Sequence, residues 1–157
     1  MALNAYLRLH AKSQGEIKGS VTQKGREGSI MVIAVDHEIF QHQGGDQDSA
    51  GKPDQKPITI TKEVDRSTPA LINAYVNQEK ITKWELEFWQ PSASGKEEQF
   101  FTIQLSDALI VGIHLEMLNN KYPENMQHKE REHVSFTYRT IVWEYEDGGM
   151  TAEDVWH

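Results

Sequence analysis

The sequence predicts a mainly β fold, an antiparallel barrel or sandwich with one short helix. Apolar and polar side chains alternate along most of the chain, which is the pattern of half-buried strands. Eight or nine such stretches follow one another at short spacing, and Pro69–Asn77 has the clearest helix start. The 157 residues can bury a core without disulfides, so we expect one domain over residues 1–157.

The first part of the chain is predicted to form short strands joined by turns. Residues 3–10 alternate strictly, and a second strand is expected over residues 16–23, before a turn at residues 24–28. Residues 30–35 are apolar on both parities. We therefore expect one parity of this run to face the core, and the other to face either the core or a neighbouring subunit.

A long polar segment, Gln43–Pro57, interrupts the strand pattern. It contains three glycines, two prolines and no large apolar residue. Loops of this length inside a compact domain are usually functional or disordered, so we expect a long extended loop here. Strand alternation resumes at residues 58–61.

The predicted helix, Pro69–Asn77, begins at a Ser-Thr-Pro sequence. We expect the Thr68 hydroxyl to accept a hydrogen bond from a free N–H of the first turn, and Pro69 suits the first helical position because it lacks an N–H. Because so short a helix is not stable alone, we expect it to pack against the sheet.

The remaining predicted strands span residues 84–88, 101–105, 109–115 and 133–145, and a short final strand ends at Trp156. Gly112 lies inside one of these strands, where a glycine indicates a bulge or a close backbone approach. Residues 119–131 are predicted to form a second polar connection.

Composition excludes several classes of protein. The chain has no cysteine, which excludes disulfides, thiol catalysis and cysteine-based metal centres. Its formal net charge of −8 argues against nucleic acid as a partner. It has no apolar run long enough to span a membrane and no start typical of a signal peptide, so we expect no membrane partner and export by another route.

Residues for catalysis or metal binding are not evident in the sequence. The seven histidines include two pairs spaced by five, which point to opposite faces of a strand, and His114 has no obvious partner. The carboxylate pairs Glu63 with Asp65 and Glu85 with Glu87 are interpreted as water-facing strand positions rather than as acid–base pairs. We therefore expect no catalytic residues, no cofactor and no bound metal, and no enzyme activity.

Five segments, spread in order over nearly the whole chain, point to a known family. They are residues 17–21, 26–30, 60–65, 67–71 and 143–148, that is Ile-Lys-Gly-Ser-Val, Arg-Glu-Gly-Ser-Ile, Ile-Thr-Lys-Glu-Val-Asp, Ser-Thr-Pro-Ala-Leu and Trp-Glu-Tyr-Glu-Asp-Gly. With them the sequence resembles the Hcp (haemolysin-coregulated protein) family, the tube-forming subunit of the bacterial type VI secretion apparatus. No one segment is diagnostic, but together they are specific.

This resemblance implies a β-barrel with one flanking helix that assembles into hexameric rings. The rings stack into a hollow tube inside a contractile sheath, with a VgrG-type spike protein at the tip, and the lumen carries small effector proteins for which the subunit acts as a chaperone. The tube assembles in the cytoplasm and is secreted without a signal peptide. Because the sequence ends soon after the closing strand, we expect the plain tube subunit without an appended domain.

The resemblance also suggests roles for particular surface residues. The long loop is expected to reach an adjoining subunit, the turns at residues 24–28 and 92–95 to lie on the ring faces, and two acidic residues of one strand parity to line the lumen. The candidates are Asp46, Asp48, Lys52, Asp54 and Lys56 for the inter-subunit loop, Lys24, Arg26, Ser94 and Gly95 for the ring faces, and Asp36 and Glu38 for the lumen.

Two alternative functions remain open at this point. One is a monomeric small-molecule-binding β-barrel with Trp84, Phe88 and Phe101 around its cavity, and the other is a small hydrolase that uses the carboxylate pairs. The measured particle mass separates these hypotheses, because only the tube subunit requires about six protomers.

Overall fold

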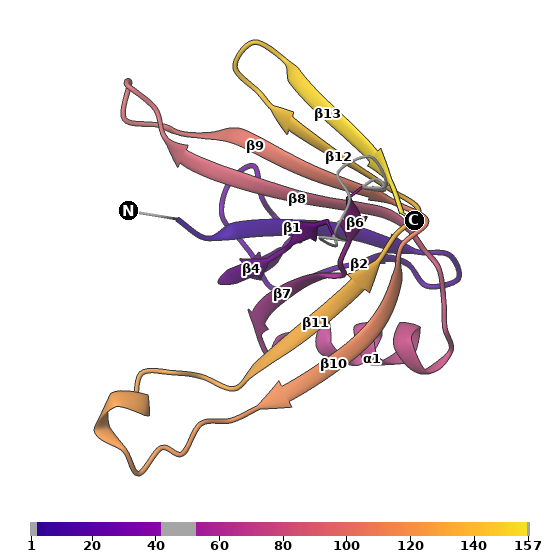
Figure 1. Cartoon of the computed structure of the whole chain (residues 1–157). Coiled ribbons are helices and arrows are strands. Elements are labelled where there is room, and N and C mark those ends of the chain that lie inside the picture. Colours follow the sequence, from indigo (N-terminus) through magenta and orange to yellow (C-terminus); the bar gives the residue numbers. More distant parts are fainter. Residues whose placement is uncertain (1–2, 42–52, 157) are drawn as a thin grey trace.

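The computed structural model describes residues 3–41 and 53–156, and its strands fall into antiparallel sheets (Figure 1). The described strands are β1 (Ala5–Ala11), β2 (Gly15–Ile17), β3 (Ile30–Val32), β4 (Ala34–Asp36), β5 (Ile39–Phe40), β6 (Asp54–Gln55), β7 (Ile58–Glu63), β8 (Ile81–Pro91), β9 (Glu97–Ser106), β10 (Leu109–Glu116), β11 (Arg131–Thr137), β12 (Thr140–Tyr145) and β13 (Met150–Val155), with the helix α1 (Thr68–Val76) and a 3-10 turn at Pro123–Asn125. The mainly β, antiparallel fold with one flanking α-helix in the described part of the chain is confirmed.

Two sheets enclose the core. The larger has the order β13-β12-β9-β8-β1-β2, with β3 also paired to β1, and the four-stranded sheet has the order β10-β11-β7-β4. A third, two-stranded pair, β5 with β6, stands at the base of the segment 42–52. In Figure 1 the large sheet crosses the upper part of the view, and β7, β10 and β11 cross beneath it with α1 against them.

Strand periodicity explains the core between the two sheets. In the large sheet, Leu7, Leu9 and Leu86 point inward and are fully buried. Trp84 joins them and meets Phe136 of the four-stranded sheet edge to face, with ring centroids 5.5 Å apart. Burial of each such side chain stabilises the fold by about 1.5–3 kcal/mol.

The apolar run at residues 30–35 changes sheet in its middle. Ile30 and Val32 are buried in β3 on the large sheet, but Ile33 is 44% exposed and its N–H donates to the Thr61 carbonyl (2.8 Å). The chain then continues as β4, paired with β7. The even-numbered residues of this run therefore face the core only as far as Val32. The chain turns at Ile33, and the alternation of inward and outward side chains changes there.

Two predicted strands need correction. Residues 133–145 form two strands in different sheets, β11 and β12, because the chain turns at Tyr138 and the Arg139 N–H pairs with Ser106 (2.9 Å). Residues 16–23 are a strand only as far as Ile17. Beyond it, Gly19 passes so close to the backbone of Ser29 that a Cβ would lie 2.3 Å from that carbonyl oxygen, which no regular ladder permits.

Helix α1 forms where the sequence predicts it, but its start is stabilised differently. Pro69 lies in the first turn, and Leu71 and Ala74 are buried. The Thr68 hydroxyl accepts from the Asp65 N–H (3.1 Å), upstream of the helix, so its predicted capping role is wrong. Among the described residues, no helix is long and apolar enough to cross a membrane.

Candidate functional site: the polar face of the four-stranded sheet

The four-stranded sheet buries one face and presents the other, here called the polar sheet face, on its far side. Ile58, Ile60, Val134 and Phe136 point into the core. The alternate residues form three rows across the strands, set by the register. The rows are Asp36, Thr59, Ser135 and Gly112; Ala34, Thr61, His133 and His114; and Glu63, Arg131 and Glu116.

Hydrogen bonds across the strands order this face. Thr59 Oγ1 and Ser135 Oγ lie 2.8 Å apart, and Thr61 Oγ1 lies 2.9 Å from His133 Nδ1. The Glu116 carboxylate approaches His133 Nε2 to 3.7 Å. The result is a surface of hydroxyl, imidazole and carboxyl groups that is suited to polar ligands or peptides.

His114 and His133 face each other on neighbouring strands, with ring centroids 5.6 Å apart and planes tilted by 32°. Sequence reasoning missed this pair, because spacing along one strand says nothing of a partner on the next. A usable signal existed: pairing Glu116 with Arg131 across the hairpin also places His114 opposite His133.

A buried ion network lies behind this face. Lys62 is 0% exposed, and its ammonium contacts Glu132 Oε1 (2.5 Å), Asp65 Oδ1 (3.0 Å) and Thr68 Oγ1 (3.2 Å). Asp65 Oδ1 also accepts from the Ser67 N–H (2.8 Å). Asp65 is therefore bound within the fold, apart from Glu63, and the two carboxylates do not act as a pair.

The second carboxylate pair is also occupied within the fold. Glu87 is buried, lies 3.4 Å from Arg8 Nε and accepts from Trp89 Nε1 (3.3 Å). The interpretation of Glu87 as water-facing is therefore wrong. Burial, followed by the nearby Glu87 carboxylate, raises the pKa of Glu85.

The ring-face candidates divide into buried and exposed residues. The Arg26 guanidinium lies over the Tyr6 ring (5.0 Å) and the Trp89 ring (4.5 Å) and pairs with Glu97 (2.6 Å). It is thus engaged within its own subunit, because the loop folds back over the large sheet. Lys24, Ser94 and Gly95 are exposed, and their place on a ring face stays a prediction.

The inter-subunit loop candidates are only partly described. Asp46, Asp48 and Lys52 lie outside the described residues. Asp54 belongs to β6, and Lys56 follows it. The Lys56 ammonium binds Glu38 Oε2 (3.0 Å) and lies 4.5 Å from the Phe40 ring centre. The two lumen candidates lie apart. Asp36 pairs with Thr59 on the polar sheet face, whereas Glu38, which binds Lys56, belongs to the base of the loop.

This base, here called the loop foot (residues 37–40 and 54–56), is fastened by Tyr138. The Tyr138 hydroxyl lies 2.8 Å from His37 Nε2, 2.8 Å from Gln55 Oε1 and 3.0 Å from the Lys56 carbonyl. The Gln55 amide donates to Asp154 Oδ2 of β13 (2.8 Å). Burial, followed by the charge of Asp154, raises the pKa of Tyr138, and burial lowers the pKa of His37.

The aromatic residues of the small-molecule hypothesis pack on one another instead of lining a cavity. Trp84 is 1% exposed and contacts Phe136. Phe88 and Phe101 pack at 5.5 Å between ring centroids. A surface depression of about 410 Å³ lies elsewhere, beside Val21 and Val64.

A match to a secretion-system family accompanies this architecture. The family model described as "Type VI secretion system effector, Hcp" matches residues 6–145. The chain belongs to the Hcp family, and the resemblance found in the sequence is confirmed.

Individual relatives agree over the whole length. The "Major exported protein" of Pseudomonas aeruginosa is 34% identical over 168 aligned positions, which cover 99% of this chain and 96% of that protein. The structure of a mutant of the Hcp1 protein from the Escherichia coli EAEC 042 pathovar is similar at 29% identity and a TM-score of 0.88, covering 99% of this chain and 100% of that one. Secreted protein Hcp3 from Pseudomonas aeruginosa is 30% identical with a TM-score of 0.81, covering 98% of both chains.

Proposed function

We propose that this chain is the structural subunit of a type VI secretion tube, a single domain that forms hexameric rings which stack into a hollow, secreted tube. The observation that carries the proposal is membership of the Hcp family over residues 6–145. In this proposal the chain has no catalytic role, and its partners are other copies of itself, a VgrG-type spike protein, the contractile sheath and small effectors in the lumen.

Open strand edges support self-assembly. Among the described strands, β10 and β4 end the four-stranded sheet and β13 ends the larger one. Edge strands leave backbone N–H and C=O groups unpaired by the sheet, and a second chain satisfies them readily. A closed ring of identical subunits repeats one such contact around its axis.

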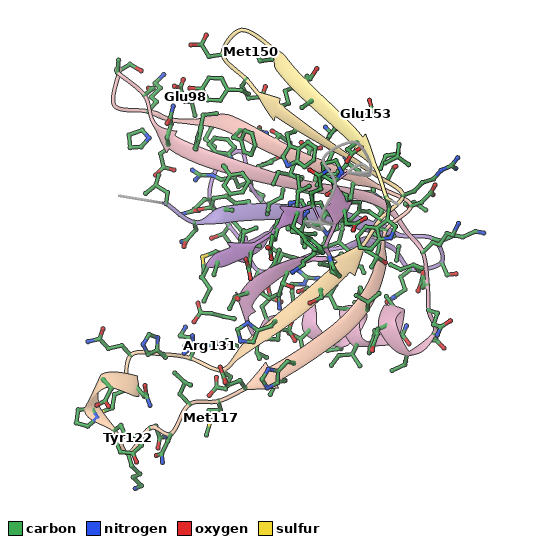
Figure 2. All side chains as sticks on the ribbon, viewed as in Figure 1. Glu98, Met117, Tyr122, Arg131, Met150 and Glu153 are labelled. Carbon is green, nitrogen blue, oxygen red and sulfur yellow. The ribbon has the colours of Figure 1, made fainter. Side chains whose placement is uncertain are left out.

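Exposed apolar side chains support it further. Helix α1 and β10 share an apolar margin, defined here as Ile72, Val76, Val111 and Leu115, with exposed fractions from 40% to 68%. A neighbouring arm, residues 117–130, projects from the body, and Figure 2 shows Met117 at its base, where the chain leaves β10, and Tyr122 near its far end. Covering such surface with another copy gains roughly 25 cal/mol for each Å² removed from water.

The polar sheet face is the part of the subunit that we assign to the lumen. It carries the lumen candidate Asp36 together with the hydroxyl and histidine rows. A hydrated, hydrogen-bonding wall suits a channel that must hold cargo without trapping it, because apolar contact would bind unfolded chains indiscriminately.

Light scattering after size exclusion, with negative-stain microscopy, tests the assembly. We expect a particle near six times the 18.0 kDa protomer, seen as rings. Val76→Glu with Leu115→Glu places two charges in the apolar margin and should shift the particle toward the monomer, while Tyr145→Glu, at an exposed position of the interior strand β12, should not. A wild-type protein that stays monomeric at every concentration contradicts the proposal.

The proposed route runs from assembly in the cytoplasm to secretion without a signal peptide. Its support is that the relative from Pseudomonas aeruginosa is named "Major exported protein". We expect the intact chain in the culture medium of cells with a working type VI apparatus. Equal amounts in the medium of cells that lack the apparatus would refute this route.

A further inference from the structure

The pair His114 and His133 on the polar sheet face is not explained by tube assembly. The two residues are opposite each other in the β10–β11 register, so both imidazoles stand on the same face. Their ring centroids are 5.6 Å apart. His114 is exposed and the His133 side chain is 33% exposed, so solutes reach both rings.

The separation of the rings is slightly larger than that of two imidazoles bound to one metal ion. With metal–nitrogen bonds of about 2.0–2.1 Å and an angle between 110° and 120° at the metal, two imidazole centroids lie about 5.2–5.5 Å apart. The observed 5.6 Å requires little movement of either side chain.

Neighbouring groups prepare His133 as a ligand. The Thr61 hydroxyl lies 2.9 Å from Nδ1, so Nε2 is the ring nitrogen left to bind a metal ion. Such a hydrogen bond on the second ring nitrogen commonly orients a metal-binding histidine. The Glu116 carboxylate lies 3.7 Å from Nε2, and Arg131 Nε approaches the same oxygen to 3.7 Å. The positive charge of Arg131 offsets the negative charge of Glu116, so the affinity for a metal ion must come from the two imidazoles.

In the described part of the chain, no group of three or more histidine, aspartate or glutamate side chains converges on a metal position. A site at this place therefore has two protein ligands, with water in the other positions. Imidazole favours zinc, copper and nickel among the divalent ions, whereas magnesium and calcium prefer oxygen ligands.

We propose that His114 and His133 form a two-imidazole binding site for a divalent transition metal ion of the nickel, copper and zinc class. Both ligands come from one chain, so the site does not depend on ring formation. In the proposed ring each subunit would carry one copy of it on the lumen side.

Calorimetric titration of the untagged full-length protein with nickel or zinc chloride tests the site. We expect one ion bound per chain, and binding that weakens as the pH is lowered because the imidazoles must be deprotonated. His114→Asn and His133→Asn should each lower the affinity at least tenfold. His128→Asn, an exposed histidine outside both strands, is the matched control and should leave it unchanged.

Imidazole proton resonances give a second readout that does not depend on heat. The signals missing from the spectra of His114→Asn and His133→Asn identify the resonances of these two histidines. On addition of zinc to the wild type, these resonances should shift. The proposal is overturned by affinities within twofold of wild type in both variants, or by an equal loss in His128→Asn. Because the ligands lie in one chain, a monomeric protein that binds nickel refutes the tube and leaves this site standing.

Discussion

Lys62 fixes the joint between α1 and the four-stranded sheet. Its ammonium is fully buried and contacts Glu132 on β11 and both Asp65 and Thr68 at the helix start. Glu132 Oε2 has no hydrogen-bond partner among the described residues, and Oε1 accepts from the Thr68 hydroxyl (3.0 Å), so Lys62 supplies the charge that balances this carboxylate. A buried ion pair adds little net stability over an apolar pair, but loss of one member leaves a charge without compensation.

Lys62→Met should therefore lower the free energy of unfolding by about 3–5 kcal/mol, measured by urea denaturation. The double variant Lys62→Met with Glu132→Leu removes the two fully buried charges and should recover much of that loss, while Asp65 keeps the hydrogen bond from the Ser67 N–H. Lys83→Met, at an exposed position, is the control. A single variant as stable as the wild type would show that Glu132 finds another partner.

Strand parity predicts which single residues are buried, but not which residues they contact. The alternation places Ile58, Ile60 and Phe136 in the core, because burial follows strand parity directly. The same parity puts a lysine, Lys62, into the core, and its partner is 70 residues away. The His114 and His133 pair likewise depends on register between strands, which no spacing along one strand specifies.

Predicted elements fail where the chain turns from one sheet to the other. Helix α1 and the central parts of β8 and β9 follow from local signals, namely the Ser-Thr-Pro start and the alternation at residues 84–88 and 101–105. Both strands extend beyond these stretches, and a bulge shifts their register after Phe88. The corners at Ile33 and Tyr138 lie in stretches of sequence without glycine or proline. The position of each corner is set by the strands that pair with the segments before and after it. Most of those strands are distant in sequence, so local patterns do not predict the corner.

One side chain, Tyr138, joins the parts of the loop foot. Tyr138→Phe removes the hydroxyl that joins His37, Gln55 and the Lys56 carbonyl. We expect a loss of about 1–3 kcal/mol, because buried polar groups are left unpaired. Amide hydrogen exchange should quicken in β5 and β6 while β8 keeps its protection. Tyr145→Phe, an exposed tyrosine, is the control. Unchanged amide exchange in β6 would show that the backbone hydrogen bonds between β5 and β6 are stable without the Tyr138 hydroxyl.

His37 makes the loop foot sensitive to acid. Burial lowers its pKa in the folded protein below the ordinary 6.5, so the folded state resists protonation. Above pH 6.5 neither state holds the proton and stability is full. As the pH falls from there toward the folded-state pKa, only the unfolded chain takes it up, so stability declines and then levels off.

Thermal melts between pH 7.5 and pH 5 should show this decline, and it should be smaller in His37→Gln. His128→Gln, an exposed histidine, should follow the wild type and corrects for unrelated titrations. Parallel curves for wild type and His37→Gln would contradict the assignment.

The two predicted ring-face turns lie at one end of the subunit. The turn at residues 92–95 follows β8, and Arg26 holds the turn at residues 24–28 to the same end through Glu97 and Trp89. The opposite end is where β1 finishes, because Ala11 pairs with Ile81 at the start of β8. Ser13 lies just beyond it. In the proposed tube, with these turns on one ring face, rings stacked head to tail bring the end with Ser94 against the end with Ser13.

Engineered cysteines test this geometry cleanly, since the chain has none of its own. Ser94→Cys with Ser13→Cys should give covalent links between rings when stacked material is treated with a short bis-maleimide and run on a denaturing gel. Each single variant should give none, because head-to-tail stacking never brings two copies of one end together. Strong linkage by Ser94→Cys alone would mean that rings meet face to face, and tubes unlinked in every variant would place the stacking contact away from these turns.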